Sequence, residues 1–446
     1  MTAAGALRPV DATVPGVLRL AVPVTLANIS TPLLGLASST VVGRLGEAHL
    51  LAAVAVATTI VNFLFWGMGF LRMGTAALVA QARGAGDEEA RRVALARALA
   101  LAVALGAALI ALSRWLGDLG FAAMGASERA TQAARLYFDV RIWSAPFALV
   151  NYVVLGALLG SGRATLALAI QAGLNLTNAG LAILFVAALG WGLAGAAWAT
   201  LIAEALIAVA GLVAFRRMGW RFLASRAAIL ERSGLRRTLG MNRDIMIRTA
   251  ALLAAFALFT AMAARMGDVE MAANAVLMTL FTLVSYGLDG FATAAEQMAG
   301  QSVGARDEAG FRRAMRVAAW FCLALGALGA LAALLGGGAL IDLMTTNEET
   351  RAASRALLAY AALTPLVGAP AFLLDGVFIG ATWTRDMRRL MLAALAIFLL
   401  ALAALKGFGA AGLWSALLIF LAARGALQFW RYPALTRATF ARRRAD

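Results

Sequence analysis

The sequence predicts an all-α integral membrane protein built from two similar halves, and two observations lead to this fold class. The first is apolarity: hydrophobic residues make up 62% of the chain and charged residues 14%, whereas soluble proteins average roughly half and a quarter. Apolar runs of about 20 residues recur from end to end, each long enough to cross a bilayer as a helix. Helices are expected because lipid offers no partner to an unpaired backbone group.

The second observation is a repeat with a period of 220 residues. The segment 81–88, QARGAGDE, returns at 301–308 as QSVGARDE, and Gly156 and Gly160 return as Gly376 and Gly380. Two halves that each contain an even number of spans enter the membrane with the same polarity. The repeat is therefore predicted to be parallel, about an axis along the membrane normal, and proteins of this design commonly form their site between the lobes.

Twelve spans are predicted, six in each half. They lie near 15–40, 50–80, 93–113, 136–160, 164–189 and 192–215, and near 244–265, 271–300, 312–340, 355–382, 387–405 and 409–430. The longest basic connection separates the halves. We therefore predict an amino-terminal six-helix lobe at 1–215, a basic cytoplasmic linker at 216–243, a carboxyl-terminal six-helix lobe at 244–430 and a basic cytoplasmic tail at 431–446.

The net charge of +16 is explained by the placement of the arginines. They crowd every second loop and the tail, at 83–97, 216–237, 306–316, 385–389 and 442–444, while the intervening loops carry few. This asymmetry follows the positive-inside rule and predicts cytoplasmic termini in a multi-pass protein of the inner (plasma) membrane. No nucleic-acid partner is expected.

Rare residue types exclude whole classes of chemistry. Lys406 is the only lysine and precedes Gly407, so no phosphate-binding GK[ST] loop exists. His49 is the only histidine and Cys322 the only cysteine. The sequence therefore lacks the set of ligands for a zinc site, and a Ser-His triad is not expected. We expect no enzyme activity, no metal and no cofactor.

Acidic residues inside predicted spans are the strongest functional signal. An ionisable side chain at bilayer depth costs about 2.5–3.5 kcal/mol on insertion scales. Glu204 lies in the sixth span, Asp289 and Glu296 share one face of the eighth, and Asp375 lies in the tenth. Either these acids exchange a coupling ion, or each is held in a permanent ion pair with Arg72 or Arg248 that fixes helix packing.

Several segments resemble the MATE (multidrug and toxic compound extrusion) family, and within it the DinF-like branch. They are residues 70–74, 241–249, 273–279, 288–296 and 375–382. The resemblance implies a V-shaped pair of six-helix lobes. It also implies a secondary transporter that uses a proton or sodium gradient to export small organic, cationic or amphipathic compounds from the cytoplasm by alternating access. We expect a monomer.

Two departures from the family pattern concern the amino-terminal lobe. Ser38 stands where the family has a first-span aspartate, and Ala182 stands where a fifth-span aspartate is expected. Neither side chain titrates near neutral pH. The predicted ion-coupling residues are therefore Asp375, which the resemblance aligns with a cation-binding acid of the sodium-coupled branch, together with Asp289, Glu296 and, in the amino-terminal lobe, Glu204.

Uncharged side chains are predicted to shape a substrate cavity, because amides and flexible methionines suit varied organic ligands. The candidates are Asn175, Asn178, Asn274, Met278 and Tyr286. Two other functions stay open. One is a flippase for a lipid-linked precursor, disfavoured by Arg72 and Arg248 being the only evident arginines within spans. The other is a transport-impaired membrane sensor or scaffold, suggested by the missing acids.

Overall fold

The computed structural model describes residues 7–43, 48–125 and 127–445, and the side chains of 30–52 and 442–445 lie outside that description. All regular elements in the described residues are helical. Their contacts define two compact units. We call Leu26–Val79 with Asp87–Asn242 the amino-terminal unit, and Met1–Thr25 with Ala80–Gly86 and Arg243–Asp446 the carboxyl-terminal unit.

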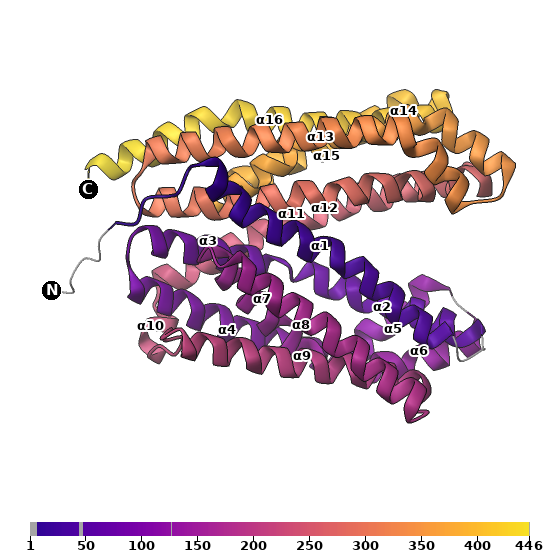
Figure 1. Cartoon of the computed structure of the whole chain (residues 1–446), viewed down its shortest axis with the longest axis horizontal. Helices are drawn as coiled ribbons and strands as arrows, with labels where there is room; N and C mark the ends of the chain where they lie inside the picture. Colours follow the sequence, from indigo (N-terminus) through magenta and orange to yellow (C-terminus); the bar gives the residue numbers. More distant parts are fainter. Residues whose placement is uncertain (1–6, 44–47, 126, 446) are drawn as a thin grey trace. The chain divides into compact units, whose positions relative to one another are not determined.

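The amino-terminal unit contains a bundle of short and long helices (Figure 1). In chain order they are α2 (Ala48–Gly67), α3 (Phe70–Gly84, whose last residues belong to the other unit), α4 (Glu88–Ala111), α5 (Ser113–Met124), α6 (Glu128–Arg141), α7 (Ala145–Gly160), α8 (Ala164–Ala182), α9 (Gly192–Arg217) and α10 (Arg226–Leu230). Helix α4 packs on α7, and α9 packs on α6, α7 and α8.

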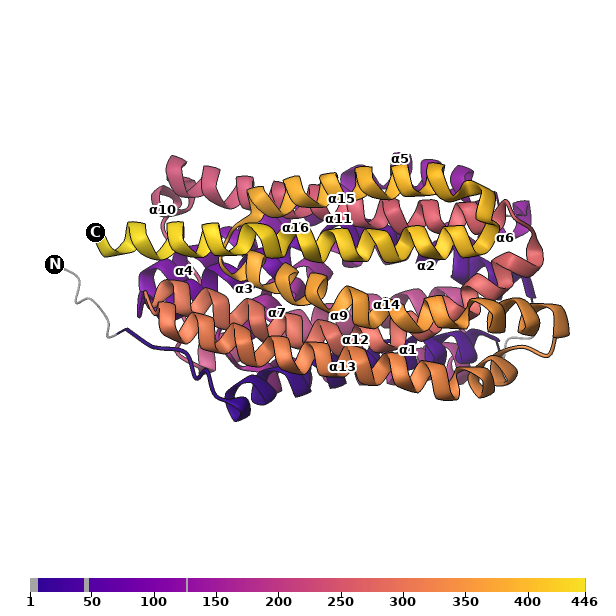
Figure 2. The ribbon, with the colours of Figure 1, turned by 90° about the horizontal axis from the view of Figure 1, so that it is seen from above.

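The carboxyl-terminal unit consists of long helices and also includes the start of α1 (Val14–Gly43). The helices are α11 (Arg232–Ala264, which begins in the other unit), α12 (Asp268–Gly304), α13 (Glu308–Met344), α14 (Glu348–Gly380), α15 (Thr384–Leu405) and α16 (Gly409–Ala445). Helix α14 is central, since it packs against α12, α13 and α16, and α15 runs beside α16 (Figure 2).

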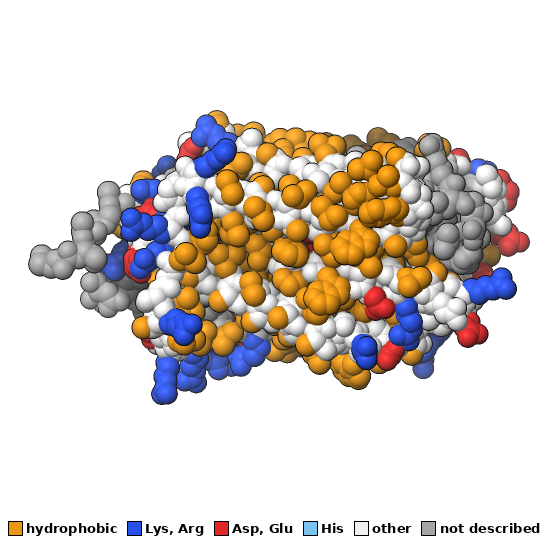
Figure 3. All heavy atoms as spheres, turned by 90° about the horizontal axis from the view of Figure 1, so that it is seen from below, with side chains coloured by type: hydrophobic (Ala, Val, Ile, Leu, Met, Phe, Trp, Pro, Cys, Tyr) orange, Lys and Arg blue, Asp and Glu red, His pale blue; other side chains and the backbone are white. Residues whose placement is uncertain are grey.

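The number of membrane-crossing helices agrees with the predicted fold class. Among the described residues, ten helical stretches are long and apolar enough to span a bilayer. The last of them, Thr384–Ala441, contains both α15 and α16, and α1 is a further helix of 30 residues. With α15 and α16 counted separately and α1 added, the count over the described residues is compatible with the twelve predicted spans. Figure 3 shows one face of the molecule, with hydrophobic side chains over its middle and charged ones toward its ends.

The repeated segments 81–88 and 301–308 build the same local structure. In each, an aspartate caps the helix that follows: Asp87 accepts from the backbone N–H of Ala90 at 2.8 Å and Asp307 from that of Gly310 at 2.7 Å. An N-cap carboxylate satisfies an amide that has no partner within the helix. The repeat therefore marks the starts of α4 and α13.

A different acid organises the connection between α10 and α11. Glu231 accepts hydrogen bonds from the backbone N–H groups of Ser233, at 2.8 Å, and Gly234, at 2.7 Å. Hydrogen bonds from the Ser233 side chain and from these amides lower the pKa of Glu231 to about 2. Its carboxylate is therefore ionised at neutral pH and caps the first turn of α11.

The repeated glycines are sites of close helix packing, and each unit uses them in the same way. A Cβ on Gly156 would lie 2.3 Å from the carbonyl oxygen of Arg72, and one on Gly376 would lie 2.0 Å from that of Ala292. Gly160 and Gly380 face the carbonyls of Ala76 and Glu296 at 2.3 and 2.0 Å. Each contact in the second half thus repeats the first at the same 220-residue offset, and it requires a residue without a Cβ.

We expect Gly376→Ala to destabilise the protein by about 1–3 kcal/mol, because the added methyl must push α14 away from α12. Thermal unfolding of the detergent-purified protein measures this. The matched control is Gly336→Ala in α13, where a Cβ would meet nothing within 4 Å. That change should be neutral or slightly stabilising. Equal stability of the two variants would contradict close packing at Gly376.

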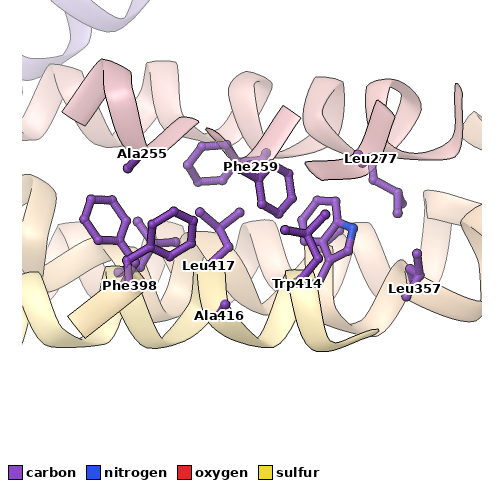
Figure 4. Packing of buried hydrophobic residues seen from close by; sticks show 14 of the residues in the cluster. Ala255, Phe259, Leu277, Leu357, Phe398, Trp414, Ala416 and Leu417 are labelled. Carbon is purple, nitrogen blue, oxygen red and sulfur yellow. The ribbon is translucent and has the colours of Figure 1, made fainter. Parts of the chain in front are cut away.

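A hydrophobic core of the carboxyl-terminal unit lies between α11, α12, α14, α15 and α16, with Ile341 of α13 at its edge. Phe259 of α11 meets Trp414 of α16 edge to face, with ring centroids 5.2 Å apart, and both are almost fully buried. Leu417 and Phe398 extend this contact (Figure 4). Edge-to-face aromatic pairs add to burial energy and fix geometry. This core therefore holds α11 and α16 rigidly beside α14.

Candidate functional site

Asp375 is the centre of a buried polar cluster in the carboxyl-terminal unit. Its Oδ2 accepts hydrogen bonds from Arg248 of α11 and, at 2.6 Å, from Arg424 of α16, and its Oδ1 accepts from Gln428 Nε2 at 2.7 Å. All four residues are at most 6% exposed. Both carboxylate oxygens are therefore occupied, and three helices are joined by one acid.

Asp289 of α12 belongs electrostatically to the same group. It interacts with Arg248 and with the hydroxyl of Tyr286, one turn earlier on the same helix. Unlike Asp375, Asp289 is only half-buried. We call Asp289, Asp375, Arg248, Arg424 and Gln428 the carboxyl-terminal charge cluster. It holds two acids and two arginines, so its ionised form is neutral overall.

The amino-terminal unit has a buried ion pair of its own. Glu204 of α9 accepts from both terminal nitrogens of Arg141 at the end of α6, at 2.8 and 3.1 Å, and each residue is 8% exposed. Arg141 also donates to Ser144, and Asn151 donates to the backbone carbonyl of Glu204 at 3.0 Å. The two-pronged geometry is the strongest that arginine forms with a carboxylate.

Arg72 lies in the neighbourhood of this pair. Tyr152 of α7 interacts electrostatically with Glu204, Arg72 and Arg141, and Arg72 itself is half-buried on α3. The amino-terminal unit thus brings Glu204 and Arg72, which the sequence singled out separately, into one electrostatic environment. The acid's direct partner, however, is Arg141.

The view that Arg72 and Arg248 are the only evident arginines within spans is wrong. Arg141 and Arg424 are buried at 8% and 3% exposure, and each binds an acid. The sequence does not mark them as buried, because Arg141 lies near the start of a predicted span and Arg424 near the end of another, where long arginine side chains commonly extend to the membrane surface. Their partners are 63 and 49 residues away, beyond any helical periodicity.

The remaining candidates are distributed over both units. Glu296 and Asn274 are buried on α12, while Met278 of the same helix packs against the hydrophobic core. On α8, Asn178 accepts from Thr200 of α9 at 3.2 Å, and Asn175 accepts from Gln171 at 3.2 Å.

The two positions where family acids are missing differ in how much the structure reveals. Ala182 is buried at the end of α8. Ser38 lies among the residues whose side chains are not described.

A repeated all-helical membrane protein with buried charges in each half has the features of a secondary transporter. Comparison with known proteins identifies the family of transporters. The MatE family model matches residues 23–184 and again residues 245–405, once in each half of the chain. The chain belongs to this family, the MATE transporters, and is a transporter rather than an enzyme. The predicted family is confirmed.

Relatives cover most of the chain. It is 38% identical over 409 residues to the DNA damage-inducible protein F of Escherichia coli (strain K12), spanning 91% of this chain and 89% of that protein. It is 30% identical over 421 residues to the "Probable multidrug resistance protein NorM" of Bradyrhizobium diazoefficiens, spanning 89% and 88%. The first match agrees with the DinF-like branch.

Solved structures show the same fold. A MATE crystal structure in the straight conformation aligns with a TM-score of 0.84 at 20% identity, over 95% of this chain and 96% of that one. A MOP superfamily transporter from Pyrococcus furiosus, described as having a binding pocket of reverse polarity, aligns with a TM-score of 0.81 at 20% identity, over 94% of this chain and 95% of that one. The all-helical transporter fold is therefore established for the chain.

Proposed function

We propose that this protein exports amphipathic organic compounds, cationic ones foremost, by antiport against protons or sodium. Family membership and relatives named as multidrug resistance proteins support export from the cytoplasm across the inner membrane. The arginine-rich loops support cytoplasmic termini. Alternating access then requires that the coupling ion and the substrate favour different states.

The observation that carries the coupling proposal is the charge balance of the carboxyl-terminal charge cluster. Two arginines face Asp375, whose oxygens are both bound, and Asp289, which is half-buried and interacts with Arg248. With both acids ionised the cluster is neutral. A proton on Asp289 leaves one uncompensated positive charge, which disfavours a second cation nearby. Proton and cationic substrate therefore compete, as antiport requires.

In this mechanism the buried acids have different roles. Asp375 and Glu204 are held by arginines through direct hydrogen bonds, so releasing either as an ion carrier would leave a guanidinium buried without its acid. They position helices. Asp289 is more accessible, and an ion that reaches it alters the environment of Arg248 without first breaking the contacts of Asp375. We therefore assign the ion-exchanging role to Asp289.

The test is Asp289→Asn in the full-length protein reconstituted into proteoliposomes. We expect dye efflux driven by a pH or sodium gradient to fall at least about tenfold, because loss of the exchangeable charge removes the coupling free energy. The gradient to which the wild type responds identifies the ion. Asp268→Asn, at the exposed start of the same helix, should leave efflux unchanged. Full gradient-driven efflux by Asp289→Asn would disprove the assignment.

A second function, flipping of a lipid-linked pyrophosphate, is favoured by one specific observation. The Nε atoms of Arg248 and Arg424 are buried and make no hydrogen bond in the described part of the chain. Two such donors suit an anionic ligand. Binding of a lipid pyrophosphate compared with a lipophilic cation separates the two functions: preference for the pyrophosphate, lost in Arg424→Gln, would replace the antiport proposal.

A further inference from the structure

A cavity of about 450 Å³ lies in the amino-terminal unit. No charged residue of the two buried groups lines it, although Ile142 of its wall directly follows Arg141. It is formed where α4, α5 and α6 meet. Its polar lining comprises Ser113, Arg114, Asp118, Arg135 and Asp139. Neither the antiport proposal nor the family comparison gives this cavity a role.

The position of the cavity along the chain places it near a membrane surface. Helix α4 has 24 residues, about 36 Å at 1.5 Å per residue, so it crosses a bilayer. Helix α5 begins two residues after α4 ends, and its 12 residues are too few to cross. The cavity thus lies at the end of α4 opposite its arginine-rich first turns, which carry Arg91, Arg92 and Arg97.

The outer side of α5 is apolar. Leu112, Trp115 and Leu119 are 52%, 64% and 58% exposed, while Gly117 and Phe121 are buried. A short helix with one apolar exposed side and an exposed tryptophan is typical of the interface between head groups and acyl chains. Trp143, at the edge of the cavity, is also exposed.

The charges that line the cavity match a zwitterion. Arg135 pairs with Asp118 at 2.6 Å and lies over the ring of Phe121. In the described part of the chain, Arg114 and Asp139 line the same cavity without an ion pair. The lining holds two positive and two negative charges. A ligand with one phosphate and one ammonium group would complement Arg114 and Asp139 and leave the site neutral.

We propose that this cavity binds the head group of a phospholipid with a primary ammonium, of the phosphatidylethanolamine type. Arg114 binds the phosphate and Asp139 binds the ammonium, while the acyl chains run along Leu112, Trp115 and Trp143. A lipid rather than a free zwitterion is chosen because the apolar residues adjoin the charged ones. Three ammonium hydrogens can donate to Asp139 and Asp118, which a trimethylated choline cannot do.

The test measures lipid binding by native mass spectrometry of the detergent-purified full-length protein. Phosphatidylethanolamine is compared with phosphatidylcholine, phosphatidylglycerol and free phosphoethanolamine. We expect the first to bind at least about tenfold more tightly than the others, and Arg114→Gln and Asp139→Asn each to reduce that affinity about tenfold. Both positions are exposed, so the variants should keep the wild-type unfolding temperature without lipid.

The matched control uses an exposed arginine and aspartate outside the cavity, Arg355 and Asp342, which pair at 2.5 Å in the carboxyl-terminal unit. Arg355→Gln and Asp342→Asn should not change lipid affinity. Equal binding of phosphatidylethanolamine and phosphatidylcholine would overturn the assignment, and so would unchanged binding in Arg114→Gln and Asp139→Asn. Equally tight binding of free phosphoethanolamine would show that the cavity is not a lipid site.

Discussion

Asp375→Asn should destabilise the protein by about 3–5 kcal/mol, because it leaves two buried arginines without the acid that joins them. An asparagine keeps the size of the side chain but removes the charge. Unfolding of the detergent-purified protein by heat or by SDS measures the effect. We also expect gradient-driven efflux to be lost, since α11, α14 and α16 are no longer held together at this point.

Two comparisons make this result specific. Asp386→Asn removes an acid that pairs with Arg431 at 2.9 Å near the surface of the same unit, and it should cost no more than about 1 kcal/mol. Combining Asp375→Asn with Arg424→Gln removes one excess positive charge and should recover part of the lost stability. A loss below about 1 kcal/mol for Asp375→Asn would mean that the buried charges find other partners.

Glu204→Gln is expected to have a similar effect in the amino-terminal unit. Arg141 would lose a two-pronged bond and remain buried as an unpaired cation, at a cost of about 3–5 kcal/mol. The double variant Arg141→Met with Glu204→Leu replaces the whole pair by apolar groups and should be more stable than the single variant. Glu89→Gln, which removes an exposed pair with Arg92, is the control.

Glu204→Gln also separates the two roles that the sequence left open for this acid. A packing role predicts lower stability together with lower transport, and recovery of both in the apolar double variant. A proton-carrying role predicts normal stability with uncoupled transport, and no recovery in the double variant. Measuring unfolding and efflux on the same preparations decides between them.

The membrane class, the helical crossings and the repeat could be predicted from the sequence because each depends on local information. A span is recognised by its length and apolarity, and the aspartates of the repeat have a local task. Asp87 caps the next helix from three residues away. The shared offset marks Gly156 and Gly376 as equivalent, although their close contacts, with the carbonyls of Arg72 and Ala292, are made between helices. The acidic residues within predicted spans could also be identified as functional candidates, because inserting a charged side chain into the bilayer is costly.

Their partners were not evident. Glu204 binds Arg141, and Asp375 binds Arg424 as well as Arg248, across helices that are distant in sequence. A hydropathy profile identifies the spans but does not indicate which helices pack against each other. In addition, a buried arginine near the end of a span has the same sequence pattern as one whose side chain extends to the membrane surface. The cavity beside α5 was equally hidden, since it depends on how α4, α5 and α6 meet.

The sequence alone therefore determined that this is a helical membrane transporter of two repeated halves and named the acids that lie within it. The tertiary structure decided that Glu204 and Asp375 are buried in hydrogen bonds to arginines, and that Asp289 is less buried than either. The reason is physical. The free-energy cost of placing a charge in lipid depends on the residue type and its depth, which the sequence indicates. The ion pair that offsets this cost requires a partner on another helix, and only the packing of the helices determines that partner.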